Sequence, residues 1–333
     1  MGDLEIPLTQ SCSSKYLARI KESMKYRIPA LAVFCLAPVF SFGSSLASAT
    51  RAVIPADVQQ IINVDYRGME DSQSGQALKT RVLPDQLKKF ETALKGVGVD
   101  PDKDVEQLTF ASFRVKSGLQ VVGVAQGDFA VNKVVARLKT KKIKPTVYRD
   151  SAMYPLDGGL SMTLLDNYNM LFGDSAALKS ALDVRDGVGS SLNSNSAITD
   201  MISSVDSDTI WSVLDEKGTQ EMMKSALGDA SNLADYNAIK NRIKNSAYKM
   251  DFGNGVKFNL NVNTSDAFTA ATLKTLLQAG VLYKKMNATP TEKVALENLV
   301  VDSDSGALKL KFETDDRKFV SLVNSDLFAA ISK

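Results

Sequence analysis

Residues 256–262 have the sequence Val-Lys-Phe-Asn-Leu-Asn-Val, in which apolar and polar side chains alternate. Successive side chains of a strand point to opposite faces, so this pattern predicts a strand that is buried on one face only. A second strand-like run, Ala247–Phe252, precedes it across Gly253-Asn254-Gly255, a turn signal because Asn and Gly tolerate left-handed backbone geometry. A half-buried hairpin of this kind favours an open antiparallel sheet over a parallel one.

Strand-like and helix-like periods occur twice along the chain in the same order. The first half predicts strands at 61–66, 108–115, 119–125, 146–149, 160–166 and 169–172, with helices at about 76–95, 129–140 and 175–184. The second half predicts strands at 209–214, 247–252, 256–262, 296–301 and 307–313, with helices at about 219–227, 232–244, 266–286 and 315–323. The predicted fold class is therefore α+β, with two tandem repeats of mostly antiparallel sheet and helices packed on one face.

Two landmarks support the pairing of the halves. Asp128-Phe129 and Asp266-Ala267-Phe268 each stand where the helix after the hairpin begins, with Asp placed as a helix N-cap in both. The border falls in the Gly/Ser/Asn-rich stretch Gly187–Ser196, which gives halves of 50–190 and 191–333. Trp211, in mid-strand, is expected in the core.

Residues 1–49 have the features of a secretion signal. A basic lead is followed by an apolar run over 28–40 and by small residues ending in Ala47-Ser48-Ala49, an A-x-A cleavage pattern. We expect cleavage after Ala49 and an exported protein, periplasmic or extracellular, that meets the membrane only transiently through this segment. Met24 is an alternative start, because Met24–Arg27 would make an ordinary short basic region. The alternative is an uncleaved anchor in the inner membrane, for which the run is short.

The amino-acid composition excludes several classes of function. Removing the five Lys/Arg and three Asp/Glu of residues 1–49 leaves 35 of each, whereas nucleic-acid binders normally carry a basic excess. Both cysteines, Cys12 and Cys35, lie in that segment, and the chain has no histidine. Triads based on histidine, Cys-His pairs and His-ligated metal sites are therefore excluded, and we expect no cofactor and no nucleic-acid partner.

Three motifs resemble catalytic or metal-binding patterns, and each also has a purely structural interpretation. Gly173-Asp174-Ser175 matches a lipase pattern, but without a histidine base it is better read as a helix N-cap. Ser246-x-x-Lys249 matches a serine acyl-enzyme pattern, but in a strand the two side chains point to opposite faces. The acidic run Asp100–Glu106 could gather oxygens around Ca²⁺, but it lacks the Gly and Glu of an EF-hand loop and reads as a solvated turn.

A dense run of basic residues lies at the C-terminal end of the helix predicted over 129–140. Cations are favourable there because this end of the helix dipole is negative. It is a candidate contact for an anionic surface such as lipid headgroups or envelope polymer. Its residues are Arg137, Lys139, Lys141, Lys142 and Lys144.

The stretch Val53–Val58, which contains a Pro-Ala-Asp turn, and the strand Ile62–Asp65 resemble the opening of uncharacterised exported bacterial proteins. That resemblance implies tandem α+β halves and no assigned activity, and it carries no catalytic residue over to this chain.

Two functions from different classes follow. The first is a non-catalytic exported protein that binds an envelope component, a lipid or another hydrophobic ligand, in a groove between the two halves. The alternative is a hydrolase or isomerase that works with carboxylates alone, which needs two carboxyl groups whose pKa values a cleft moves apart.

Overall fold

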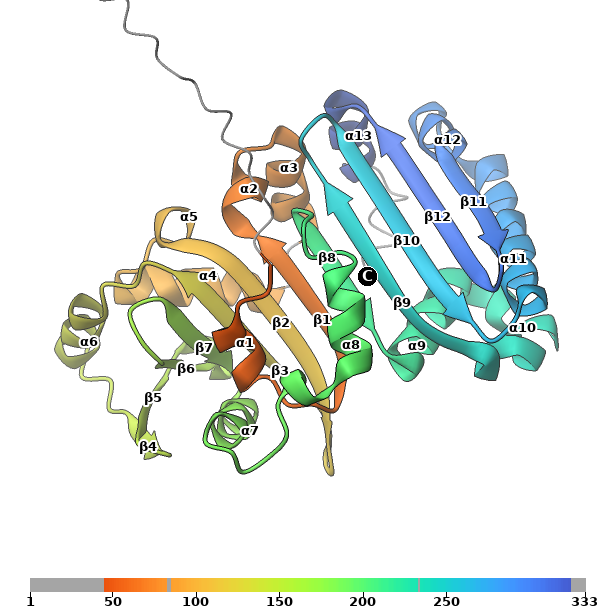
Figure 1. Ribbon diagram of the computed structural model, residues 1–333. Helices are drawn as coiled ribbons and strands as arrows, with labels where there is room; N and C mark the ends of the chain where they lie inside the picture. Colours follow the sequence, from red (N-terminus) through yellow and green to blue (C-terminus); the bar gives the residue numbers. More distant parts are fainter. Residues whose placement is uncertain (1–44, 83–84, 233, 325–333) are drawn as a thin grey trace, which may run out of the picture. The chain divides into compact units, whose positions relative to one another are not determined.

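The strands form one twelve-stranded sheet, and every neighbouring pair is antiparallel (Figure 1). The computed structural model describes residues 45–82, 85–232 and 234–324. The strands of the first half are β1 Val58–Asp65, β2 Val105–Val115, β3 Gly118–Gly127, β4 Thr146–Tyr148, β5 Ser151–Pro155, β6 Ser161–Leu164 and β7 Asn169–Gly173. Those of the second half are β8 Ile210–Leu214, β9 Ile243–Asp251, β10 Val256–Thr264, β11 Leu299–Asp304 and β12 Ala307–Thr314.

The helices alternate with these strands. In the first half they are α1 Ser48–Val53, α2 Tyr66–Glu70, α3 Gln73–Val82, α4 Asp85–Val97, α5 Pro101–Asp104, α6 Val131–Thr140 and α7 Ser175–Arg185. In the second half they are α8 Ser196–Ser203, α9 Glu216–Leu227, α10 Ala234–Ile239, α11 Ala267–Asn287, α12 Pro290–Glu297 and α13 Asp316–Val323.

The strand order repeats. Across the sheet it is β11-β12-β10-β9-β8-β1-β2-β3-β7-β6-β5-β4, so β1 and β8 pair at the centre. Outward from that pair, β1-β2-β3-β7-β6 on one side corresponds to β8-β9-β10-β12-β11 on the other. The α+β class with an antiparallel sheet and a repeated element order is therefore confirmed.

One face of the sheet carries most helices. Helices α2 to α6 and α13 pack over Leu108, Met170 and Phe172, and α9 to α11 pack over Val262 and Leu308. The register links these two areas. Ser112, on the same face of β2 as Leu108, pairs with Gln60, which pairs with Leu214. Leu214 pairs with Ser246, Ser246 with Val262, and Val262 with Leu308. The helical layer is thus continuous with the face that the alternation in residues 256–262 predicts to be buried.

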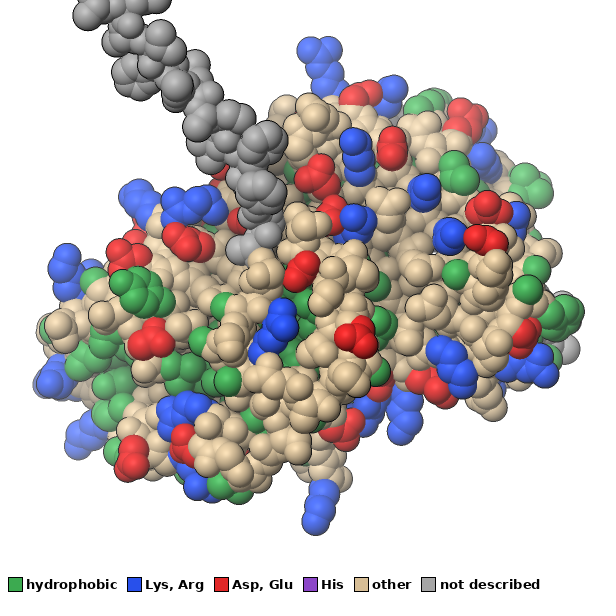
Figure 2. Space-filling model, viewed as in Figure 1, with side chains coloured by type: hydrophobic (Ala, Val, Ile, Leu, Met, Phe, Trp, Pro, Cys, Tyr) green, Lys and Arg blue, Asp and Glu red, His purple; other side chains and the backbone are tan. Residues whose placement is uncertain are grey.

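The opposite face differs between the halves. Over the first half and the adjoining strand β8 it is covered by α1, α7 and α8 (Figure 1), which pack over a second apolar layer containing Val122, Val124 and Trp211, all at most 1% exposed. In the second half Lys257, Asn261 and other polar side chains of the same face are exposed, and Figure 2 shows it as mostly polar with scattered charges. Trp211 is fully buried, as predicted.

The structure differs locally from the predicted elements. The helix predicted over 76–95 is described as two helices, α3 and α4, and residues 83 and 84 between them lie outside the described residues. Strand β5 was not predicted, because Ser151–Pro155 is short and lacks alternation.

The two landmarks of the repeat are not equivalent. Asp266 caps α11 and accepts from the Thr269 backbone N–H, as predicted. The prediction for Asp128 was wrong: α6 begins after Ala130 and has no side-chain cap, and the backbone N–H of Asp128 instead donates to the carbonyl of Asp104. Phe129 is fully buried, whereas Phe268 is 68% exposed.

The proposed cleavage residues lie at the start of α1. Ala47 is the residue before the helix and Ala49 is inside it, while Leu46 is only 2% exposed and belongs to the core beneath α7 and α8. A signal peptidase acts on an extended, unfolded segment, so cleavage after Ala49 stays a prediction; residues 1–44 lie outside the described residues. Among residues 45–324, as far as they are described, no helix is both long and apolar enough to cross a bilayer.

Candidate functional site

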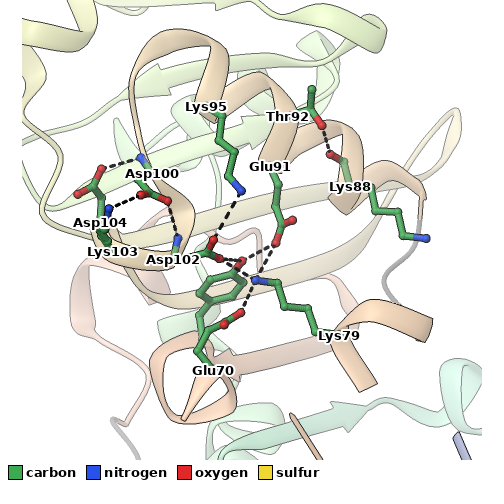
Figure 3. Close-up of polar contacts among 11 residues, drawn as sticks. Glu70, Lys79, Lys88, Glu91, Thr92, Lys95, Asp100, Asp102, Lys103 and Asp104 are labelled. Carbon is green, nitrogen blue, oxygen red and sulfur yellow. Dashed lines mark hydrogen bonds and ion pairs between the residues drawn. The ribbon is translucent and has the colours of Figure 1, made fainter. Parts of the chain in front are cut away.

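Charged side chains of three neighbouring helices surround Lys79 (Figure 3). The Lys79 ammonium, on α3, contacts Glu70 of α2, lies 3.5 Å from Glu91 of α4 and is 2.8 Å from Asp102 of α5. It also lies 4.3 Å from the centre of the Tyr66 ring, a cation–π distance. The cluster, hereafter the Lys79 cluster, therefore joins four helices through one cation.

The Tyr66 side chain completes this cluster. It is 1% exposed, and its hydroxyl donates to Glu91 and lies 3.3 Å from an Asp102 carboxylate oxygen. Lys95 adds a second cation, 3.5 Å from Asp102. Only Asp102 stands in a pattern that the sequence singled out, the acidic run Asp100–Glu106. The other members come from α2, α3 and α4 and stand in no recognised motif.

The electrostatics of the Lys79 cluster favour stability over reactivity. Burial raises the pKa of the Tyr66 phenol, and the hydrogen bond to Glu91 raises it further. Burial alone would lower the pKa of Lys79, but hydrogen bonds to Asp102 and Glu70 outweigh it and raise that pKa. A catalytic tyrosine or lysine base needs a lowered pKa, so neither group is activated.

One carboxylate of the cluster, Asp102, is held in its ionised form. The hydrogen bond from Lys79 lowers the pKa of Asp102, which keeps that group ionised rather than able to donate a proton. The shallow hollow here has a volume of about 350 Å³, and Lys79 lines it together with Glu70, Glu91 and Asp102. A carboxylate-only hydrolase needs one acid with a raised pKa, and the pKa of Asp102 is shifted in the opposite direction.

The other motifs occupy structural positions. Asp174 caps α7 by accepting from the Ala177 backbone N–H at 2.8 Å. Ser246 is buried against Thr219, whereas Lys249 lies in the same strand and pairs with Asp208 at 2.8 Å. In the acidic run, Asp100 caps the short helix α5. Within the described residues no group of three or more His, Cys, Asp or Glu side chains is placed to hold a metal ion.

The basic run forms the exposed end of α6 and the turn after it. Arg137, Lys139, Lys141, Lys142 and Lys144 are all exposed, and none pairs with a carboxylate within the part of the chain that the structure describes. We call these five residues the α6 basic end.

Two backbone hydrogen bonds fix the geometry of the turn that follows α6. The Ile143 N–H donates to the Leu138 carbonyl at 3.0 Å and the Lys142 N–H to the Lys139 carbonyl at 2.9 Å, the two bonds of a Schellman motif. Lys142 occupies its left-handed position, with a φ of 59°, where glycine is usual. A lysine is thus held at a position that favours glycine, in a turn of defined geometry.

The groove predicted between the halves does not coincide with either of the two hollows described. One is the hollow of the Lys79 cluster, lined by residues of α2 to α5 in the first half. The other, of about 280 Å³, lies in the second half between α12, β12 and α13, with Val294, Phe312 and Leu322 in its lining.

Comparisons with known proteins give a distant likeness in chain path. No family model and no curated protein matches this sequence. Crystal form III of TP0453 is similar over 82% of this chain and 96% of that chain, with 8% identity and a TM-score of 0.47. Crystal form I of TP0453 is similar over 82% and 95%, with 9% identity and a TM-score of 0.46.

Proposed function

We propose that this protein is an exported, non-catalytic binding protein of the cell envelope, periplasmic or extracellular, and that the α6 basic end attaches it to an anionic surface. The observation that carries the proposal is the set of five exposed cations without a carboxylate partner among the described residues. Between Asp128 and Asp150 the sequence has no Asp or Glu. The local field is therefore positive although the chain from residue 50 onward is neutral overall.

The chemistry recognised is a dense array of negative charges, on lipid headgroups or on an anionic envelope polymer. Each Lys or Arg close to an anionic membrane contributes on the order of 1 kcal/mol, and the attraction decays within a Debye length. The proposal is supported further by the Lys79 cluster, where the pKa values of Tyr66 and Lys79 are raised and that of Asp102 is lowered, the opposite of what an activated base or acid needs.

The test is binding of the full folded chain to vesicles with and without phosphatidylglycerol, and to isolated anionic cell-wall polymer. Replacing the five residues of the α6 basic end by Gln is expected to weaken binding by more than about tenfold, and added salt should weaken the wild type likewise. The matched control replaces five exposed lysines scattered over other elements, Lys116, Lys217, Lys224, Lys257 and Lys293. Equal losses in both variants would show a non-specific charge effect and reject the proposal.

Comparing the vesicles with the cell-wall polymer distinguishes a lipid ligand from a polymer ligand. Binding to vesicles alone identifies a lipid surface, and binding to polymer alone identifies the wall. Binding to neither, with both variants folded, rejects attachment through α6.

A further inference from the structure

Helix α1 belongs to the core although it contains Ala49, the last residue of the predicted cleavage pattern. Leu46, two residues before the helix, is 2% exposed and lies in the same apolar cluster as Leu178 and Ile198. Thr50, inside the helix, is fully buried. A segment that is cut off during export cannot supply these contacts to the folded protein, so the burial of Leu46 and Thr50 bears on where the chain is cut.

Polar contacts also join the residues on the two sides of Ala49. The Leu46 carbonyl accepts from the Arg51 Nε at 3.0 Å, and the Ala47 carbonyl accepts from the Arg51 backbone N–H at 3.1 Å. A cut after Ala49 removes both acceptors together with the Leu46 side chain. The residues before that cut therefore stabilise the residues that follow it.

A cut after Ala49 would also place a charge inside the core. The new first residue would be Thr50, and its backbone nitrogen would become an ammonium group at a residue that is 0% exposed. Transferring an ammonium group from water into an apolar region is far more costly than transferring a neutral N–H group. The rest of α1 would have to leave the core to hydrate that charge, so this cut conflicts with the observed packing.

The sequence offers cleavage positions other than Ala49. A signal peptidase requires small side chains at the last residue before the cut and two residues before that one. Residues 41–49 contain four such pairs of small residues. These pairs end at Gly43, Ser45, Ala47 and Ala49.

Burial distinguishes between these four pairs. The two cuts after alanine remove Leu46 from the protein. A cut after Ser45 makes the buried Leu46 the first residue and gives it the N-terminal charge. A cut after Gly43, with Ser41 at the other small position, keeps Leu46 and leaves the exposed Ser45 ahead of it. Gly43 also lies only three residues beyond the apolar run over 28–40, in the part of a signal peptide where cleavage occurs.

We infer that signal peptidase cuts this chain after Gly43, so that the mature protein begins at Ser44 and keeps α1 in its core. The step is hydrolysis: water adds to the Gly43–Ser44 peptide bond and gives a carboxylate on Gly43 and an ammonium group on Ser44. The inference rests on the proposed export, and it replaces the cut after Ala49 that the sequence pattern alone predicts.

The test is the first residue of the protein purified from the envelope or the medium of the cells that make it, identified by N-terminal sequencing and intact mass. The expected result is one species that begins at Ser44. Any other first residue, Thr50 included, or a chain that keeps residues 1–43 would overturn the inference. Such a species in the envelope leaves the proposed export intact, whereas unprocessed protein confined to the cytoplasm rejects both.

Two substitutions test the cut at the positions themselves. Gly43→Leu places a large side chain directly before the inferred cut and should reduce the species that begins at Ser44 at least about tenfold. The matched control, Ala49→Leu, changes an exposed residue and should leave the first residue of the mature protein unchanged. The reverse outcome, in which only Ala49→Leu reduces processing, would assign the cut to Ala49 and contradict the inference.

Discussion

At the scale of single residues, the Lys79 cluster shows how one cation can stabilise several helices. Its ammonium is shared by three carboxylates, and its side chain is only 13% exposed. We expect Lys79→Met to lower the free energy of unfolding by about 2 kcal/mol, less than for a fully buried pair because Asp102 is partly exposed. Urea denaturation at neutral pH measures this difference. The matched control is Lys95→Met, because Lys95 is 55% exposed and makes a single contact at 3.5 Å.

The pH dependence of this stability difference follows from the pKa of Asp102. The pKa of Asp102 is lowered in the folded state, so its contribution is present above the unfolded pKa and is lost as pH falls through the folded value. The difference between wild type and Lys79→Met should therefore be constant around neutral pH and shrink below about pH 4. A difference that grew on acidification, or a control variant as unstable as Lys79→Met, would refute this account of the cluster.

At the scale of elements, α1 joins the start of the chain to the core. Leu46 is 2% exposed and its carbonyl accepts from the Arg51 Nε at 3.0 Å, while the Arg51 backbone N–H donates to Ala47. A variant that starts at Thr50 should be less stable than one that starts at Ser45 by about 2–4 kcal/mol, the cost of deleting a buried leucine. Thermal and urea unfolding of the two variants measure it, and equal stabilities would show that α1 contributes nothing before Thr50.

The elements also show what the sequence can and cannot predict. Alternation in Val256–Val262 predicted a half-buried strand because the side-chain period is local, and Val256 and Val262 are indeed fully buried. The three helices on the opposite face could not be placed in the same way, because which face a helix covers depends on distant strands. The Lys79 cluster was missed for the same reason. The α6 basic end could be predicted because its five cations lie within residues 137–144 of the sequence.

At the scale of the whole molecule, the two halves share their cores. Trp211 of the second half packs in the same apolar cluster as Ile61 and Val124 of the first, and Phe252 and Phe319 of the second lie in the cluster that contains Tyr66. Strands β1 and β8 also pair directly at the centre of the sheet.

Because neither half can bury its core alone, we expect the described unit to unfold in one cooperative transition despite its repeated topology. Trp211 is the only tryptophan, so its fluorescence reports the central strand β8, while far-ultraviolet circular dichroism reports all helices. The two probes should give the same urea midpoint, and a separate chain of residues 191–333 should not fold. Two distinct midpoints, or a folded second half, would mean that the repeats are independent domains and that the shared core contributes little to stability.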